Sequence, residues 1–100
     1  MWTKVCSEDD IKDNSILAKD IGDRQLMICR ISDTITITDR ICTHEYADLS
    51  CGFVSPDGVR CPLHLSVFDV NTGESLNPPA TEPLTVFNVK IESGEIYVEV

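Results

Sequence analysis

The stretch at residues 42–70, CTHEYADLSCGFVSPDGVRCPLHLSVFDV, carries a cysteine–histidine pair at its start and another near its end. The first pair is Cys42-Thr43-His44 and the second is Cys61-Pro62-Leu63-His64, with sixteen residues between the two pairs. Thiolate and neutral imidazole are the side-chain ligands that late transition metals prefer. The pattern therefore predicts a metal centre held by two loops, at about residues 42–50 and 61–66.

Two kinds of metal centre use two cysteines and two histidines. Structural zinc sites commonly take these four ligands, although zinc clips usually pair cysteine with cysteine and histidine with histidine. Here each clip mixes the two residue types, as C-x-H and C-x2-H. Mixed clips favour a binuclear iron centre in which one iron takes both thiolates and the other takes both imidazoles. The spacing alone leaves the zinc alternative open.

Much of the remaining chain has the composition of β-strands. Residues 34–38, TITIT, alternate polar and apolar side chains, and residues 84–91 and 95–100 alternate more loosely. All three segments are rich in β-branched or aromatic residues, which favours strands. The sequence ESGE at 92–95 predicts a hairpin turn between the last two strands, and a polar break follows the apolar run LMICRI at 26–31.

Three further segments complete the predicted fold. Ser7, followed by acidic residues, predicts a helix start of one or two turns, and a short hairpin is expected around FVSPDGVR at 53–60. The prolines of NPPATEP, at 77–83, predict a stiff loop, since proline cannot donate to a β-ladder. We therefore predict an all-β chain: an antiparallel β-sandwich or small barrel with two metal-binding loops at one tip and at most one short helix.

Length and charge limit the classes of function. One hundred residues make a single domain, 1–100. The 17 acidic and 8 basic residues give a formal net charge of -9, which disfavours nucleic acid and anionic membrane as partners. The acidic surface suits either a docking partner with a basic patch or simple solubility. The sequence contains no apolar run of the roughly 20 residues that span a bilayer and no signal peptide pattern at its start, so we expect a cytoplasmic protein.

Three cysteines lie outside the two clips. Cys6, Cys29 and Cys51 are expected to be free thiols, because a reducing compartment disfavours disulfides. Cys29 lies within an apolar run and is expected in the core, whereas Cys51 follows a loop and is expected to be more exposed.

Several motifs resemble those of one family. The clips CTH and CPLH, the preceding DRICTH, the segments FDVNTGE and PPATEPL and the closing VKIESGEIYVEV make the chain look like a Rieske ferredoxin. Rieske ferredoxins are the small electron carriers of multicomponent bacterial aromatic-ring oxygenases. The resemblance implies one 2Fe–2S cluster, with Cys42 and Cys61 on one iron and His44 and His64 on the other.

The resemblance also implies a function and partners. The chain would carry one electron, without catalysis of its own, from an NAD(P)H-dependent flavin-containing ferredoxin reductase to a terminal Rieske oxygenase, and would act as a monomer. Two alternatives remain beside this interpretation. One is the small Rieske subunit of an assimilatory nitrite reductase, and the other is a structural zinc module without a redox role.

The chain departs from the family at positions that bear on the reduction potential. Glu45 stands where the family commonly has glycine, and Asp48 adds a second carboxylate near the first clip. Ala47 and Leu63 stand where high-potential relatives have a disulfide. Ser66 occupies the position of a serine that hydrogen-bonds the cluster in those relatives, but Phe68 replaces their tyrosine. The resemblance therefore implies a potential near the bottom of the Rieske range, about −150 mV.

Side chains near the clips have simpler expected roles. Leu65 and Phe68 are expected to pack under or beside the cluster loops, and Leu49 is expected either to shield the cluster or to belong to the core. Tyr46 could cover the first loop or face a partner, and Trp2 is expected at the edge of the core rather than in a docking surface.

Overall fold

The computed structural model describes residues 1–42, 47–56, 58–62, 67–76 and 82–100. Every strand in these ranges pairs antiparallel with its neighbours, as the sequence predicted. The described residues contain two short 3-10 helices and no α-helix. No helix in them is long and apolar enough to cross a membrane.

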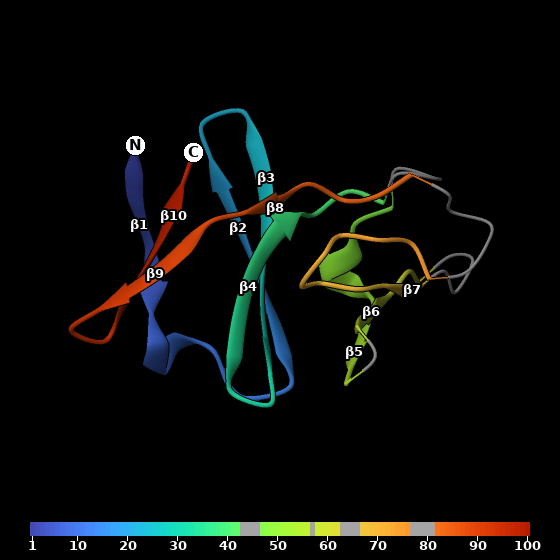
Figure 1. Ribbon diagram of the computed structural model, residues 1–100, viewed down its shortest axis with the longest axis horizontal. Helices are drawn as coiled ribbons and strands as arrows, with labels where there is room; N and C mark the ends of the chain where they lie inside the picture. The colour runs from blue at the N-terminus through green and yellow to red at the C-terminus, as the bar shows by residue number, and fades with distance from the viewer. Residues whose placement is uncertain (43–46, 57, 63–66, 77–81) are drawn as a thin grey trace.

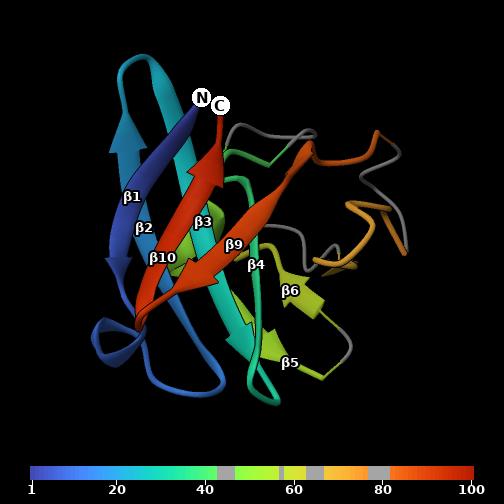
Figure 2. The ribbon, with the colours of Figure 1, turned by 60° about the vertical axis from the view of Figure 1, so that its left-hand side comes forward.

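Two sheets form the base of the molecule. The first has the order β1-β10-β9, with β1 at Trp2–Ser7, β9 at Val89–Glu92 and β10 at Glu95–Glu99. Figure 2 shows this sheet in front of the second one. The backbone carbonyl of Val100 accepts a hydrogen bond of 3.1 Å from the Met1 amino group, so the two chain ends lie side by side.

The second sheet has the order β2-β3-β4-β8. Strand β2 spans Ser15–Ile21, β3 Arg24–Ile31, β4 Thr34–Asp39 and β8 Val86–Phe87. The predicted strand at 84–91 is therefore divided, because Asn88 lies between β8 in this sheet and β9 in the other sheet. One segment thus connects the two layers of the sandwich.

A smaller unit, here called the lobe, stands beside the base (Figure 1). It contains a three-stranded sheet in which β5 (Phe53–Ser55) and β6 (Gly58–Arg60) form the predicted hairpin and β7 (Val67–Phe68) pairs with β6. A 3-10 helix, η2 (Leu49–Cys51), precedes this sheet in a segment that the sequence predicted as loop.

The predicted helix start at Ser7 is a single 3-10 turn. Helix η1 spans Glu8–Asp10, and the Ser7 hydroxyl accepts a hydrogen bond from the Asp9 backbone N–H while the Asp10 carboxylate accepts one from the Ser7 N–H. These bonds satisfy two donors at the start of the turn. Because Ile11 returns to extended geometry, the helix ends there.

Strand β3 has buried side chains on both of its faces. Leu26 and Ile28 belong to a core between the two base sheets, here called the base core, together with Ile37, Ile96 and Val98. The alternate residues, Met27 and Cys29, belong to a second core on the lobe side, here called the lobe core. A strand covered on both faces needs a continuous apolar run, which explains the sequence LMIC. Cys29 is 0% exposed, so its predicted core position is confirmed.

Candidate metal centre

The two clip cysteines lie together in the lobe core. Cys42 and Cys61 are each 1% exposed, and both belong to the same buried group of side chains, which also contains Leu49 and Phe68. Cys61 directly follows β6, whereas Cys42 follows β4 after a short connection. Two residues 19 positions apart in the sequence are therefore buried in the same apolar region.

Backbone hydrogen bonds close the first clip. The Cys42 N–H donates to the Ala47 carbonyl at 2.7 Å, and the Leu49 N–H donates to the Arg40 carbonyl at 2.8 Å. An isolated antiparallel bridge pairs Ile41 with Asp48 between these two bonds. The backbone on either side of the first clip, at Arg40–Cys42 and at Ala47–Leu49, is thus paired as a short β-ladder that holds Cys42.

The pairing of β6 with β7 sets the position of Cys61, the first residue of the second clip. Arg60 pairs with Val67 and Val59 with Phe68 across the two strands. Gly58 has φ +137°, and a Cβ there would lie 2.0 Å from the Phe68 carbonyl oxygen. Only glycine allows this approach, because any side chain would push the strands apart. The close pairing fixes the strand end from which Cys61 emerges.

The remaining cysteines differ from the two clip residues in burial or in chemistry. Burial raises the pKa of Cys29 to about 12, and burial, with Asp10 nearby as the next cause, raises the pKa of Cys6. Burial therefore favours the protonated form of both thiols. Cys51 lies in η2 and is exposed, as predicted.

Half of the predicted ligand set lies outside the part of the chain that the structure describes. His44 and His64 lie outside the described residues, as do Glu45, Tyr46, Leu63, Leu65, Ser66 and most of the predicted proline loop. Among the residues that are described, no group of three or more histidine, cysteine or acidic side chains lies close enough to hold a metal ion. The candidate ligands that the structure brings together are Cys42 and Cys61.

The family described as the Rieske [2Fe-2S] domain matches residues 1–88. This chain belongs to the Rieske [2Fe-2S] domain family. The Rieske chain is 37% identical over 99 residues to Ferredoxin CarAc of Metapseudomonas resinovorans, covering 98% of this chain and 92% of the relative. It is 33% identical over 97 residues to the ferredoxin component of the biphenyl 2,3-dioxygenase of Rhodococcus jostii (strain RHA1), covering 97% and 91% of the two.

Solved structures agree with this assignment. A chain from the complex of reduced oxygenase and oxidized ferredoxin in carbazole 1,9a-dioxygenase is 38% identical, with a TM-score of 0.91, covering 97% of the Rieske chain and 91% of that chain. A putative NADH-dependent nitrite reductase small subunit from Mycobacterium tuberculosis has a TM-score of 0.87 at 21% identity, which shows the fold alone. The cofactor is a Rieske [2Fe–2S] cluster, and the zinc alternative is wrong.

The described residues fit one side of such a cluster. Two thiols in a single apolar region are the donor set that one iron of a Rieske cluster takes. Phe68 and Leu49, each 0% exposed, pack in the same region, which confirms that Phe68 lies beside the clips. Leu49 belongs to the core, which was one of its two expected roles. The cysteines themselves are 1% exposed, and solvent exposure is one factor that sets a cluster's potential.

One residue beside the first clip was missed in the sequence. Arg40 is 8% exposed and forms ion pairs with Asp20, at 2.9 Å, and with Asp48, at 3.4 Å. The sequence suggested that Asp48 would place a negative charge near His44, but its carboxylate is paired with Arg40 and also accepts hydrogen bonds from Ser50. An arginine directly before a clip, in DRICTH, was the available signal.

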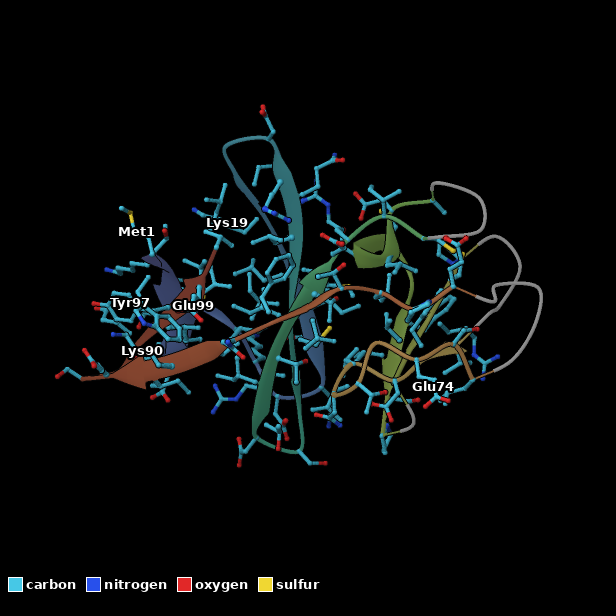
Figure 3. The ribbon with its side chains drawn as sticks, turned by 45° about the horizontal axis from the view of Figure 1, so that its top comes forward. Met1, Lys19, Glu74, Lys90, Tyr97 and Glu99 are labelled. Carbon is cyan, nitrogen blue, oxygen red and sulfur yellow. The ribbon has the colours of Figure 1, made fainter. Side chains whose placement is uncertain are left out.

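Trp2 lies far from the clips. It is 38% exposed on β1, and the Lys90 ammonium lies 4.8 Å from its ring centroid and 5.5 Å from that of Tyr97. Figure 3 shows Lys90 and Tyr97 together at the end of the molecule away from the lobe. The contacts of Trp2 are thus those of a residue at the outer face of the base sheet.

Proposed function

We propose that this Rieske protein is a one-electron carrier between an NAD(P)H-dependent flavoprotein reductase and the Rieske centre of a terminal aromatic-ring oxygenase. The observation that carries the proposal is the identity of 37% over 98% of the chain to Ferredoxin CarAc. The match to a chain of a ferredoxin–oxygenase complex supports it. The carrier works as a single domain of residues 1–100, is monomeric and catalyses no reaction itself. Its free core cysteines, Cys6 and Cys29, suit a reducing cytoplasm.

The ligand set of this proposal is Cys42 and Cys61 on one iron and His44 and His64 on the other. Two observations support it: the mixed clips in the sequence, and the burial of both cysteine side chains in one region. The bound cluster supplies one-electron chemistry, and histidine ligands raise its potential above that of all-cysteine clusters. The protein's own part is to hold the two thiols in a buried apolar region.

Charge near Cys42 supports an electrostatic contribution to docking. A groove of about 440 Å³ is lined by Cys42 and Ile41 and by the acidic side chains of Asp23, Asp39 and Glu82. Arg24 and Gln25 complete the lining. Because acidic residues outnumber the single basic one, a partner surface with lysine or arginine side chains would be attracted to this face. Such attraction mainly raises the association rate.

The ligand assignment is tested by metal analysis of two variants. Cys51→Ser should keep two irons and two sulfides per chain, because Cys51 is exposed and lies outside the ligand set. His64→Ala should lower the iron and sulfide content. A Cys51→Ser protein without iron, beside a His64→Ala protein with full iron, would show that the assignment is wrong.

The carrier role is tested by reduction and transfer. The purified protein is reduced with NADH and a ferredoxin reductase from an aromatic-ring oxygenase system, and its rhombic EPR signal is recorded. Transfer is then followed by mixing the reduced protein with the corresponding oxygenase and measuring reoxidation and product formation. The nitrite reductase alternative predicts no transfer here and co-purification with a sirohaem enzyme instead. That alternative has support only at the level of the fold.

A further inference from the structure

Arg40 is the one buried arginine of the described residues, with 9% of its side chain exposed. Its terminal nitrogen Nη2 lies 2.9 Å from Asp20 Oδ1, and its Nε lies 3.4 Å from Asp48 Oδ2. The second contact is an ion pair without the alignment of a hydrogen bond, because Nε has no hydrogen-bond partner. Burial of a cation is costly unless it is paired, so two carboxylates around one guanidinium indicate a position under constraint.

The two carboxylates belong to different parts of the molecule. Asp20 lies on β2, where it pairs with Gln25 of β3. Asp48 caps η2, accepting hydrogen bonds from the Ser50 N–H at 2.9 Å and the Ser50 hydroxyl at 2.6 Å. Asp20 therefore ties the arginine to the base, and Asp48 ties it to the returning side of the first clip.

The backbone of Arg40 makes the same two connections. Its N–H donates to the Gln25 carbonyl at 3.0 Å, and its carbonyl accepts from the Leu49 N–H at 2.8 Å. Both the main chain and the side chain of one residue thus hold the clip between the β2–β3 hairpin and η2. The guanidinium fork can address two carboxylates in fixed directions, which a lysine ammonium cannot do in the same way.

Arg40 also places a positive charge two residues before Cys42. Reduction of a Rieske cluster adds one negative charge. Asp20 and Asp48 offset the Arg40 charge, so a neutral side chain at position 40 leaves both carboxylates uncompensated and disfavours the reduced form. Loss of the cation should therefore make reduction harder.

We propose that Arg40 is a positioning residue for the iron–sulfur centre: with Asp20 and Asp48 it locks the first clip against the β2–β3 hairpin, and its charge favours the reduced cluster. The proposal rests on Cys42 being a ligand, as proposed above. The proposal gives a bracing role to an ion-pair network that joins Arg40 to Asp20, 20 residues before it, and to Asp48, 8 residues after it.

The base offers a matched control in Arg30. This arginine, with 24% of its side chain exposed, donates to the carbonyls of Glu8 and Ile11 and pairs with Asp33 at 3.2 Å. It lies on β3, five residues beyond Gln25, and holds η1 rather than a clip. Asp33, with 78% of its side chain exposed, pairs with Arg30 as Asp20 pairs with Arg40, so Asp33→Asn is the control for Asp20→Asn.

The experiment measures loss of iron from the oxidised holoprotein in excess chelator, by the decay of its visible absorbance, in four variants. Asp20→Asn should lose iron up to about fivefold faster than the wild type, as befits a partly exposed pair. Asp33→Asn should match the wild type. Arg40→Met should lose iron at least tenfold faster than the wild type, since it leaves two carboxylates without their cation. Arg30→Met should lose iron within twofold of the wild-type rate, even if its melting temperature falls as much as that of Arg40→Met.

Voltammetry separates positioning from general stability. Arg40→Lys keeps the charge and should keep the wild-type potential while losing iron faster. Arg40→Met should have a lower potential, with a decrease of up to tenfold in the equilibrium constant for reduction, equal to 59 mV for one electron. If Arg40→Met does not fold, the rates of iron loss from Asp20→Asn and Asp33→Asn are compared instead, and this comparison tests the positioning role. Equal iron loss in that pair, or an unchanged potential in a folded Arg40→Met protein, overturns the proposal. Neither measurement uses a reductase or an oxygenase, so failure here is distinct from failure of the carrier role.

Discussion

Replacing Phe68 with tyrosine tests the local control of the reduction potential. Phe68 is 0% exposed on β7, pairs with Val59 of β6 and packs in the lobe core with Cys42 and Cys61. Tyrosine adds one hydroxyl to this ring without otherwise changing its shape. Because Phe68 shares its buried region with both cysteines, we expect this hydroxyl to donate to a sulfur atom. A hydrogen bond to cluster sulfur or thiolate stabilises the reduced, more negative state more than the oxidised one.

The size of the effect follows from the strength of one hydrogen bond. A neutral hydrogen bond contributes about 1–1.5 kcal/mol. For a one-electron couple this equals about 40–65 mV, because a tenfold change in the equilibrium constant is 59 mV. We expect a wild-type potential of about −150 mV and an upward shift of that size in Phe68→Tyr. The extra oxygen in a filled core should lower the free energy of unfolding by about 1–3 kcal/mol at most.

Protein-film voltammetry at pH 7 measures both values. Phe87→Tyr is the control, because Phe87 lies on β8, packs against the base core and has the Arg24 guanidinium 5.3 Å from its ring centroid. Its potential should equal that of the wild type. A shift below about 15 mV in Phe68→Tyr would mean that Phe68 does not face the cluster, given the 40 mV expected from the weakest bond. A wild-type potential above about +100 mV, inside the upper half of the Rieske range, would refute the low-potential assignment and the carrier role with it.

Three further predictions concern docking and packing. Stopped-flow reduction by the reductase should slow as the salt concentration rises. At low salt, Asp23→Lys in the groove beside Cys42 should slow reduction, whereas the control Asp9→Lys on η1 should not. Equal effects of the two substitutions would assign the salt dependence to net charge alone. Leu49→Ala should lower the free energy of unfolding by about 2–5 kcal/mol and speed iron loss, as measured by thermal unfolding and chelation, because Leu49 is fully buried in the lobe core that contains both cysteines. Gly58→Ala should have a much lower melting temperature than Gly94→Ala, since a Cβ at Gly58 would lie 2.0 Å from the Phe68 carbonyl oxygen. The space around Gly94 is open, and alanine at its φ of +78° costs only about 1–2 kcal/mol. Similar melting temperatures would contradict the close β6–β7 approach.

Local patterns in the sequence were sufficient where one residue type satisfies one local requirement. The turns between β3 and β4 and between β9 and β10 have positive φ at Ser32, Asp33, Ser93 and Gly94. Two consecutive positive φ values are the geometry of a two-residue hairpin turn, and small polar residues or glycine adopt it. The alternation of TITIT likewise needs no tertiary information, because its period of two already specifies a strand.

Strands β1 and β2 were missed because their patterns are irregular. In β1 the pairing with β10 shifts between Lys4 and Cys6, and the bulge lets the adjacent residues Val5 and Cys6 both be buried. Such a pair interrupts the alternation on which strand prediction depends. Strand β2 lies at a sheet edge and has no fully buried residue, so its sequence carries little hydrophobic periodicity.

In the candidate site, too, some residues could be predicted from the sequence and others could not. Cys42 and Cys61 were found because metal ligands of fixed chemistry recur at fixed spacing within each clip. The network of Arg40 was not found, because Asp20 and Asp48 approach it only after the β2–β3 hairpin has paired and η2 has formed. Charged residues this far apart give no periodic signal, and their pairing depends on tertiary geometry.

The pairing of Asp48 changes how charge near the first clip should be understood. A carboxylate held by Arg40 and by two Ser50 donors has most of its field cancelled close by, so it contributes little attraction for a distant basic surface. Asp23 and Asp39 are acidic side chains of the groove beside Cys42. They have no ion pair of this kind among the described residues, so their charges can attract a partner at longer range. Attraction of a partner therefore depends on the groove and on the net charge of -9, whereas Asp48 acts on the shape of the clip. Bracing the clip and attracting a partner are then separate properties, which substitution can change one at a time.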